Sequence, residues 1–184
     1  MPSLLTKPTN GTVVFDLEAN GLLNNATDIF CVALYWQDEE LTESFYDQCP
    51  GKGMSSPVVR ALQWLETADI IIGHNIIGYD IPLIQSIYNW FNPTGILVDT
   101  LILSRLYHPN LYDIDKNTGK IPTKMYGSHS LEAYGHRLGE LKGDYGKTTD
   151  WSEWSQEMED YCIQDVVVTK KLCAHFPPYL SGSN

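Results

Sequence analysis

The segment Thr12-Val-Val-Phe-Asp-Leu-Glu18 decides how the chain is organised. Its β-branched and aromatic residues are typical of a strand, which we expect to span Thr12–Leu17 and to end before the turn signal Asn20-Gly21. Because side chains alternate across a strand, Asp16 and Glu18 point to one face. The segment therefore combines the first strand of the fold with a pair of carboxylates at its carboxyl end.

Outward from this strand, short apolar runs alternate with segments of helical spacing. Further strands are expected at Ile29–Trp36, Leu41–Tyr46, Ile70–Ile72 and Ile96–Val98. Helices are expected at Val58–Thr67, Asp80–Phe91, Leu101–Tyr107, Leu131–Leu138 and Trp154–Ala174. We also expect Asp99 to cap the third of these helices, and Pro109–Gly127 to form a long exposed loop.

This order of elements predicts an α/β fold with a mixed five-stranded sheet. The first three strands form an antiparallel meander, and the later strands join it in parallel through right-handed crossovers. The first strand then lies centrally, and helices cover both faces of the sheet. Because ligand sites in such sheets form at the carboxyl ends of strands, Asp16 and Glu18 lie where a site is expected.

Length and composition indicate a single domain over residues 1–184. The 184 residues are 43% hydrophobic, which is enough for a core and excludes a disordered chain. Apolar runs are too short to span a membrane, and no apolar signal core follows Met1, so we expect a cytoplasmic protein. The four cysteines form no Cys-x-x-Cys pair, which argues against a zinc site and favours reduced thiols.

The net charge of −11 at first argues against nucleic-acid binding, which needs a basic surface. The charge is unevenly distributed, however. Residues 105–147 hold seven of the twelve cations and five acids, a net charge of +2, which leaves −13 for the rest of the chain. An acidic protein can also meet phosphate through divalent cations that its own carboxylates hold, so clustered carboxylates are the feature to examine.

Two further segments place polar residues at expected element ends. His74-Asn-Ile-Ile-Gly-Tyr-Asp80 follows the fourth expected strand, and Tyr161-Cys-Ile-Gln-Asp165 lies in the last helix, where positions i and i+4 share a face. Each segment alone has a plain alternative. Asp80 could be a helix N-cap and His74 a hydrogen-bonded core histidine. The helical pair could be a tyrosine packed on the sheet and a solvated aspartate.

Taken together, the segments indicate a metal centre. The topology can bring four carboxylates to one edge of the sheet, from Asp16, Glu18, Asp80 and Asp165. Ligand sets made of oxygen alone select hard cations such as Mg²⁺ or Mn²⁺. Two such ions, about 3.5–4 Å apart, serve in-line displacement at phosphorus in many enzymes. We therefore predict a site for two Mg²⁺ or Mn²⁺ ions.

The ordered set Asp16-x-Glu18, His74-Asn75 to Tyr79-Asp80, and Tyr161-x-x-x-Asp165 resembles the DEDD superfamily of 3′→5′ exonucleases, tyrosine subclass. Three further segments look like the proofreading domain of podovirus (T-odd phage) family A DNA polymerases: Asp99–Leu106, Gly127–Gly139 and Gln164–Lys170. The resemblance extends from Thr12 to Phe176 and implies an RNase H-like fold.

The resemblance also implies roles for the acidic residues and the tyrosine. Asp16, Glu18 and Asp165 would hold the first metal ion. Asp16 and Asp80 would contribute to binding the second metal ion, Asp80 partly through water. Tyr161 would orient the attacking water.

Substrate contacts are implied at two places. Leu22 falls where the family places an apolar wedge against the terminal bases, and Asn75 falls where it places a substrate contact. We include the neighbouring His74 in this predicted substrate-binding set.

The resemblance thus predicts a metal-dependent 3′→5′ exonuclease that hydrolyses single-stranded or frayed DNA 3′ ends to 5′-mononucleotides. The expected partners are a DNA 3′ end and a separate or fused DNA polymerase, in the host cytoplasm if a phage encodes the chain. The Met1 start and the uncharged end favour a complete small gene product over a domain cut from a longer chain.

Three alternatives stay open. One is a 3′→5′ exoribonuclease of the same superfamily, because the carboxylates do not read the sugar. The second is a non-catalytic nucleic-acid-binding or polymerase-docking module. The third is an acidic α/β protein of unrelated function.

Overall fold

The computed structural model describes residues 11–47, 53, 55–140 and 153–176. The strands are β1 (Thr12–Ala19), β2 (Ile29–Trp36), β3 (Leu41–Tyr46), β4 (Ile70–Gly73) and β5 (Ile96–Asp99). The helices are α1 (Pro57–Glu66), α2 (Asp80–Ile87), α3 (Thr100–Tyr107), α4 (Leu111–Thr118), the 3₁₀ turn η1 (Thr123–Met125), α5 (Leu131–Leu138) and α6 (Gln156–His175).

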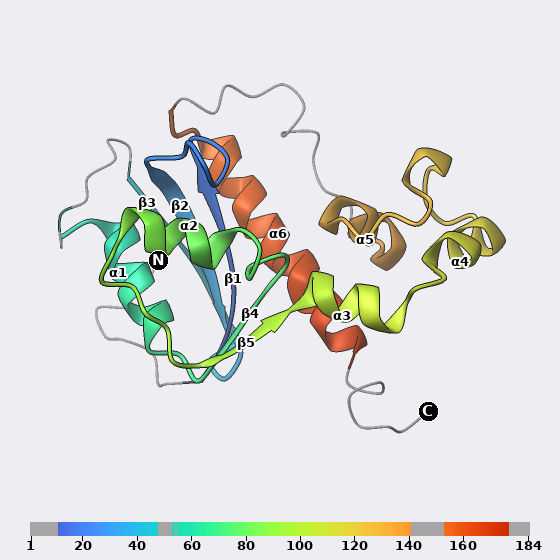
Figure 1. Ribbon diagram of the computed structural model, residues 1–184, viewed down its shortest axis with the longest axis horizontal. Helices are drawn as coiled ribbons and strands as arrows, with labels where there is room; N and C mark the ends of the chain where they lie inside the picture. Colours follow the sequence, from blue (N-terminus) through green and yellow to red (C-terminus); the bar gives the residue numbers. More distant parts are fainter. Residues whose placement is uncertain (1–10, 48–52, 54, 141–152, 177–184) are drawn as a thin grey trace.

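The strands form one mixed sheet in the order β3-β2-β1-β4-β5 (Figure 1). β1 pairs antiparallel with β2, and β2 pairs antiparallel with β3. β4 lies parallel to both β1 and β5. The predicted meander, the central position of β1 and the parallel later strands are therefore confirmed.

Helices cover both faces of this sheet, as expected. On one face, Val13, Phe15 and Leu17 of β1 pack in a core cluster with buried side chains of α1 and α2. On the other face, Val14 packs in a second cluster with residues of α6 that include Cys162. Figure 1 shows α6 crossing behind the sheet and α1 and α2 on its opposite side. The alternation along β1 follows from the two-residue period of a strand.

The prediction of a long exposed loop over Pro109–Gly127 is wrong. This stretch contains α4 and η1, and Asp115 within α4 is 1% exposed. The Asp115 carboxylate accepts hydrogen bonds from Arg137 Nε and Nη2, at 2.9 and 2.8 Å, and from the Gly127 backbone N–H at 2.8 Å. The segment is thus folded against α5 by a buried ion pair, which composition alone does not reveal.

Other differences concern the ends of elements. The helix expected over Asp80–Phe91 ends at Ile87, because Tyr88 adopts extended backbone and packs with Phe91 into the core instead. β1 runs two residues beyond Leu17, so Glu18 still pairs with β2. Asp99 caps α3 as predicted, and its side chain accepts from the Leu101 and Ile102 backbone N–H groups.

Cys31 and Cys162 are buried thiols and Cys173 is a partly buried one, whereas Cys49 lies outside the described residues. Within the described ranges, none of the helices combines the length and apolar character that a membrane span requires.

Candidate metal centre and active site

The centre of the site is the carboxyl end of β1. Asp16 and Glu18 lie on the same face of the strand as Val14, which is the face covered by α6. Both side chains are half-buried. The sheet register places Asp16 opposite Ala33 and Glu18 opposite Cys31 on β2, so small side chains flank the two carboxylates.

α6 brings the third carboxylate to this place. The Cys162 thiol donates a hydrogen bond to the Asp16 carbonyl oxygen over 3.3 Å, which seats the middle of α6 on the end of β1. Three residues further along, Asp165 is buried, with 7% of its surface exposed. Oxygen atoms of Asp16, Glu18 and Asp165 all lie within 4.8 Å of one another. The predicted convergence of β1 and the last helix is therefore present.

Asp80 is the first residue of α2, while the N-cap position belongs to Tyr79 and carries no side-chain cap, so Asp80 is not there to cap the helix. Burial raises the pKa of Asp80 to about 7, and the charges of Asp99 and Asp165 act in the same direction. Asp80 is thus a buried acid that lies close enough to Asp165 to feel its charge, although it is not part of the three-residue cluster.

The pKa of Tyr79 is affected by the same group of acids. Burial raises its pKa to about 12, and the charges of Asp80, Glu18 and Asp16 act in the same direction. The Tyr79 ring therefore stands among carboxylates that come from β1 and α2. Three of the four acids named from the sequence thus form the cluster at the carboxyl end of β1, and Asp80 is close enough to Asp165 to be affected by its charge.

A pocket of about 300 Å³ adjoins these acids. It is lined by Glu18, Ala19, Gly21, Leu22 and Tyr79. The side chain of Leu22 is 75% exposed at its rim. An exposed leucine beside a metal-ligand candidate fits the predicted contact with a base, because burial against an aromatic ring would remove apolar surface from water.

The remaining predicted residues lie in two other segments. Tyr161 is half-buried on α6, one turn before Asp165. His74 is half-buried, and its Nδ1 lies 2.9 Å from the Thr100 hydroxyl, in agreement with the hydrogen-bonded alternative for this histidine. Asn75 is exposed with a positive φ of 66°, and its backbone N–H donates to Asp99.

The donor set suits a hard divalent cation. Carboxylates this close repel one another in the absence of a cation, and an all-oxygen set of half-buried and buried acids is the kind that Mg²⁺ and Mn²⁺ take in proteins. The convergence of three carboxylates, with a fourth buried acid beside them, therefore fits such an ion.

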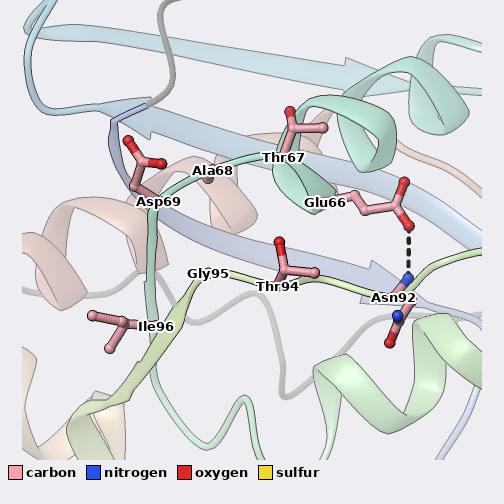
Figure 2. Close-up of a pocket in the computed structure, with 8 residues that line it drawn as sticks. All are labelled: Glu66, Thr67, Ala68, Asp69, Asn92, Thr94, Gly95 and Ile96. Atoms are coloured by element: carbon pink, nitrogen blue, oxygen red, sulfur yellow. Dashed lines mark hydrogen bonds between the residues drawn. The ribbon is translucent and has the colours of Figure 1, made fainter.

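A larger pocket of about 520 Å³ lies elsewhere (Figure 2). Figure 2 shows Glu66 turned toward Asn92, and the Glu66 carboxylate accepts a hydrogen bond from the Asn92 backbone N–H at 2.7 Å. Asp69 lies on the opposite side of the pocket. Ile70 and Ile96 begin β4 and β5, so this pocket lies at the amino ends of the parallel strands, away from the acidic cluster. This pocket therefore lies at the opposite edge of the sheet from the one where ligand sites of such sheets are expected.

The comparison with protein families settles the class of fold. Residues 13–176 match a family model described as RNase H superfamily. The chain belongs to the RNase H superfamily. The match covers β1 from Val13 onward, the other four strands and α6, and the sheet order agrees with the mixed five-stranded sheet predicted for this class.

Sequence relatives confirm the resemblance to phage polymerases. The chain is 35% identical to the DNA-directed DNA polymerase of Enterobacteria phage T3 over 199 aligned residues, and 33% identical to that of Escherichia phage T7 over 203. Each alignment covers 90% of this chain and 27% of the polymerase. This member of the superfamily thus spans about a quarter of the length of those relatives.

Among solved structures, Brucella melitensis NrnC with bound Mg²⁺ is similar, with a TM-score of 0.64 and 17% identity. The similarity covers 100% of this chain and 79% of NrnC, and it supports the fold.

Sequence reasoning missed two residues of the site. The motif His74–Asp80 indicates no role for Tyr79, although the Tyr79 side chain lines the pocket and the charges of nearby acids raise its pKa. Asp99 was expected to be a helix cap, and the structure adds contacts to the segment after β4. These contacts are tertiary, so no spacing within either segment indicates them.

Proposed function

We propose that the chain is a single metal-dependent 3′→5′ exonuclease domain that releases 5′-mononucleotides from single-stranded or frayed DNA 3′ ends. The observation that carries this proposal is the convergence of Asp16, Glu18 and Asp165 oxygens within 4.8 Å at the carboxyl end of β1. The family supports hydrolysis of phosphodiesters, and the relatedness to two DNA polymerases supports DNA as the substrate.

In this proposal Asp16, Glu18 and Asp165 hold one divalent cation, and Asp16 and Asp80 contribute to the position of a second. Divalent cations in such a site activate a water molecule and stabilise the charge that develops at phosphorus and on the leaving oxygen. Mg²⁺ and Mn²⁺ both suit the donors, and the bound Mg²⁺ of NrnC favours Mg²⁺.

The protein side chains then perform binding and orientation. Tyr161 directs its hydroxyl to the attacking water from the same face of α6 as Asp165. Leu22 packs against the terminal base, and the pocket beside Glu18 and Tyr79 takes the terminal nucleotide. Asn75 and His74 contact the substrate from the loop before α2.

The polymerase relatives also suggest a partner. Since the chain matches 27% of each polymerase, we propose that it works with polymerase activity that is fused to it or supplied separately, and that it removes misincorporated 3′ ends. An unpaired terminus is the substrate that such a partner would deliver.

The deciding experiment uses 5′-labelled single-stranded DNA and RNA of one sequence, incubated with Mg²⁺, Mn²⁺ or EDTA. Stepwise shortening of the labelled DNA from its 3′ end in Mg²⁺ or Mn²⁺, and none in EDTA, is the expected result. Asp165→Asn should abolish it, whereas Asp69→Asn, at the opposite edge of the sheet, should leave it unchanged.

Other outcomes would replace the proposal. Faster shortening of the RNA would favour the exoribonuclease. Binding of DNA without any shortening would favour the non-catalytic module. If the protein neither binds nor shortens DNA, this result would favour an acidic α/β protein of unrelated function.

A further inference from the structure

Asp99 is a buried acid that serves two segments at once. It is the last residue of β5, it is 5% exposed, and it pairs with Gly73 at the end of β4. Its Oδ1 accepts the Leu101 backbone N–H at 2.9 Å, as a helix cap does. A cap needs no more than this, yet the carboxylate also reaches out of its own helix.

The additional contacts go to the loop that leads into α2. Oδ1 of Asp99 accepts the Asn75 backbone N–H at 3.0 Å, and Oδ2 accepts the Ile77 backbone N–H at 3.1 Å. These are charge-assisted hydrogen bonds, which are about twice as strong as neutral ones. They hold a turn in which Asn75 has a φ of 66°, a conformation that non-glycine residues rarely adopt without support.

This turn ends at Asp80. The Asn75 carbonyl oxygen accepts the backbone N–H groups of Gly78 and Tyr79, at 3.0 Å each, and α2 begins at the next residue. The path from the Asp99 carboxylate to Asp80 is therefore a short, hydrogen-bonded piece of backbone. Movement of the turn would move Asp80 relative to Asp16 and Asp165.

A second tie joins the same two segments. The Thr100 hydroxyl donates to the Gly73 carbonyl oxygen at 3.1 Å and lies 2.9 Å from His74 Nδ1. Thr100 is fully buried. Asp99 and Thr100 together fasten the start of α3 to the segment between β4 and α2. Figure 1 shows α3 following β5 at the same side of the sheet where β4 leads toward α2.

We propose that Asp99 is a positioning residue, which holds Asp80 at the distance from Asp16 that the second divalent cation requires. This inference rests on the proposed function. Asp99 itself contacts backbone amides, so its effect on the cation passes through Asp80. Outer partners of metal-binding side chains commonly change metal affinity or activity by about 10–100-fold when they are removed.

The test measures DNA shortening as a function of Mn²⁺ concentration for two variants. Asp99→Asn keeps one oxygen but replaces the other by a donor, so it cannot accept both loop amides. Asp99→Ser keeps a good cap for α3 but is too short to reach the loop. Both variants should raise the Mn²⁺ concentration for half-maximal rate about 10-fold, and excess Mn²⁺ should restore part of the rate.

Asp115→Asn is the matched control. Asp115 is also a buried acid that accepts a backbone N–H, from Gly127, but it does so in the α4–α5 region. The Asp115→Asn substitution should lower the melting temperature and leave the Mn²⁺ concentration for half-maximal rate at the wild-type value. A merely structural role for Asp99 predicts this same behaviour for Asp99→Ser.

The outcomes separate the inference from the proposed function. Wild-type protein without metal-dependent shortening would overturn the function itself. Active wild-type protein and an unshifted Mn²⁺ dependence in Asp99→Ser would overturn the positioning role alone. If both Asp99 variants fail to melt cooperatively, Thr100→Val decides, because it removes the second tie with little change in volume. It should shift the Mn²⁺ dependence in the same direction, and no shift would overturn the inference.

Discussion

The Tyr79 hydroxyl donates a hydrogen bond to the Gly21 carbonyl oxygen over 2.7 Å. This contact ties the residue before α2 to the loop after β1, across 58 positions of the chain. Leu22 follows Gly21 directly and is 75% exposed. The hydrogen bond therefore holds the loop from which the predicted apolar wedge projects.

Removal of this hydrogen bond should weaken substrate binding more than chemistry. Tyr79→Phe removes one hydrogen bond, worth about 0.5–1.5 kcal/mol, so KM for single-stranded DNA should rise about 2–10-fold with a smaller change in kcat. Steady-state kinetics checks this. Tyr88→Phe, a core tyrosine at the other end of α2, is the control and should keep the wild-type KM. An equal rise in both variants would contradict the role of the Tyr79 hydroxyl.

Divalent cations should stabilise the fold. Binding to the folded state alone adds RT ln(1 + [L]/Kd), which is about 2.7 kcal/mol at a concentration 100 times Kd. Millimolar Mn²⁺ should therefore raise the melting temperature of EDTA-treated protein, and Asp16→Ala should remove most of the rise. A melting temperature that does not respond to Mn²⁺ would count against the site.

Substitutions of Tyr161 and Asp165, the pair of residues on α6, should have different effects on rate and on Mn²⁺ affinity. The usual pKa of a tyrosine, about 10, makes Tyr161 a poor general base at neutral pH, and water activated by a cation does not need one. Tyr161→Phe should lower the rate about 10–100-fold and keep Mn²⁺ affinity, whereas Asp165→Asn should lower both. One rate assay and one Mn²⁺ titration on each variant make the comparison. Loss of Mn²⁺ affinity in Tyr161→Phe, or its full activity, would refute water positioning.

We expect the cationic stretch of residues 105–147 to form a track that supplies most of the contacts to DNA phosphates, and charge reversal tests this. Lys116, Lys120 and Lys124 are exposed on and after α4, whereas Lys142 and Lys147 of the same stretch lie outside the described residues. Reversal of the first three should weaken DNA binding in EDTA. The slope of log affinity against log salt should become shallower by about 0.7 for each phosphate that these lysines no longer neutralise. A binding titration at several salt concentrations measures both effects.

Lys170 and Lys171 on α6 are the comparison set for that experiment. Lys170 lies over the Tyr35 ring at 3.8 Å, and Lys171 pairs with Glu140, so both are already engaged within the fold. Their reversal should weaken binding less. Equally large effects from the two sets would remove the case for the α4 region as the track.

A pair of histidines should make the stability of the fold depend on pH. His108 Nε2 and His175 Nε2 lie 3.0 Å apart, a distance at which one proton is shared. Burial lowers the pKa of His108, and the charges of His175, His129 and Arg137 lower it further. A lowered pKa in the folded state means that this contribution to stability is present above the unfolded pKa of about 6.5 and is lost as pH falls through the folded value.

The melting temperature should accordingly fall more steeply below pH 6.5 in wild type than in His175→Gln, whose amide can still donate to His108 but carries no charge. Thermal melts between pH 5 and 7.5 check this. Parallel curves for the two proteins would show that the pair does not govern acid stability.

Local pattern predicted most of the architecture because the strands are short and strongly apolar. β2 and β3 have the predicted bounds: β2 is an apolar run, and β3 follows it after the short acidic turn at residues 38–40. The prediction for the α4 segment was wrong because its structure depends on a contact that is distant in the sequence. Its order depends on Asp115 and Arg137, which are 22 positions apart and meet only in the folded protein.

The candidate ligands could be named from their motifs, but the support around them could not. Asp16, Glu18 and Asp165 belong to patterns that can be recognised in the sequence. The hydrogen bonds from the Asn75 and Ile77 backbone N–H groups to Asp99 cannot be recognised in this way, because almost every residue has a backbone N–H group.

The hydrogen bond from Cys162 to Asp16 spans 146 positions, and the acidic cluster spans nearly the same length of chain. A ribosome releases β1 long before α6, and domains acquire structure as they emerge from the N-terminus. For most of its synthesis the nascent chain therefore holds two of the clustered carboxylates without the third. Asp165 joins the cluster when α6 docks on β1, so the proposed metal site is complete only after that contact has formed. Under the proposed function, nucleic acids near the translating ribosome would meet a domain that still lacks one of its three clustered carboxylates.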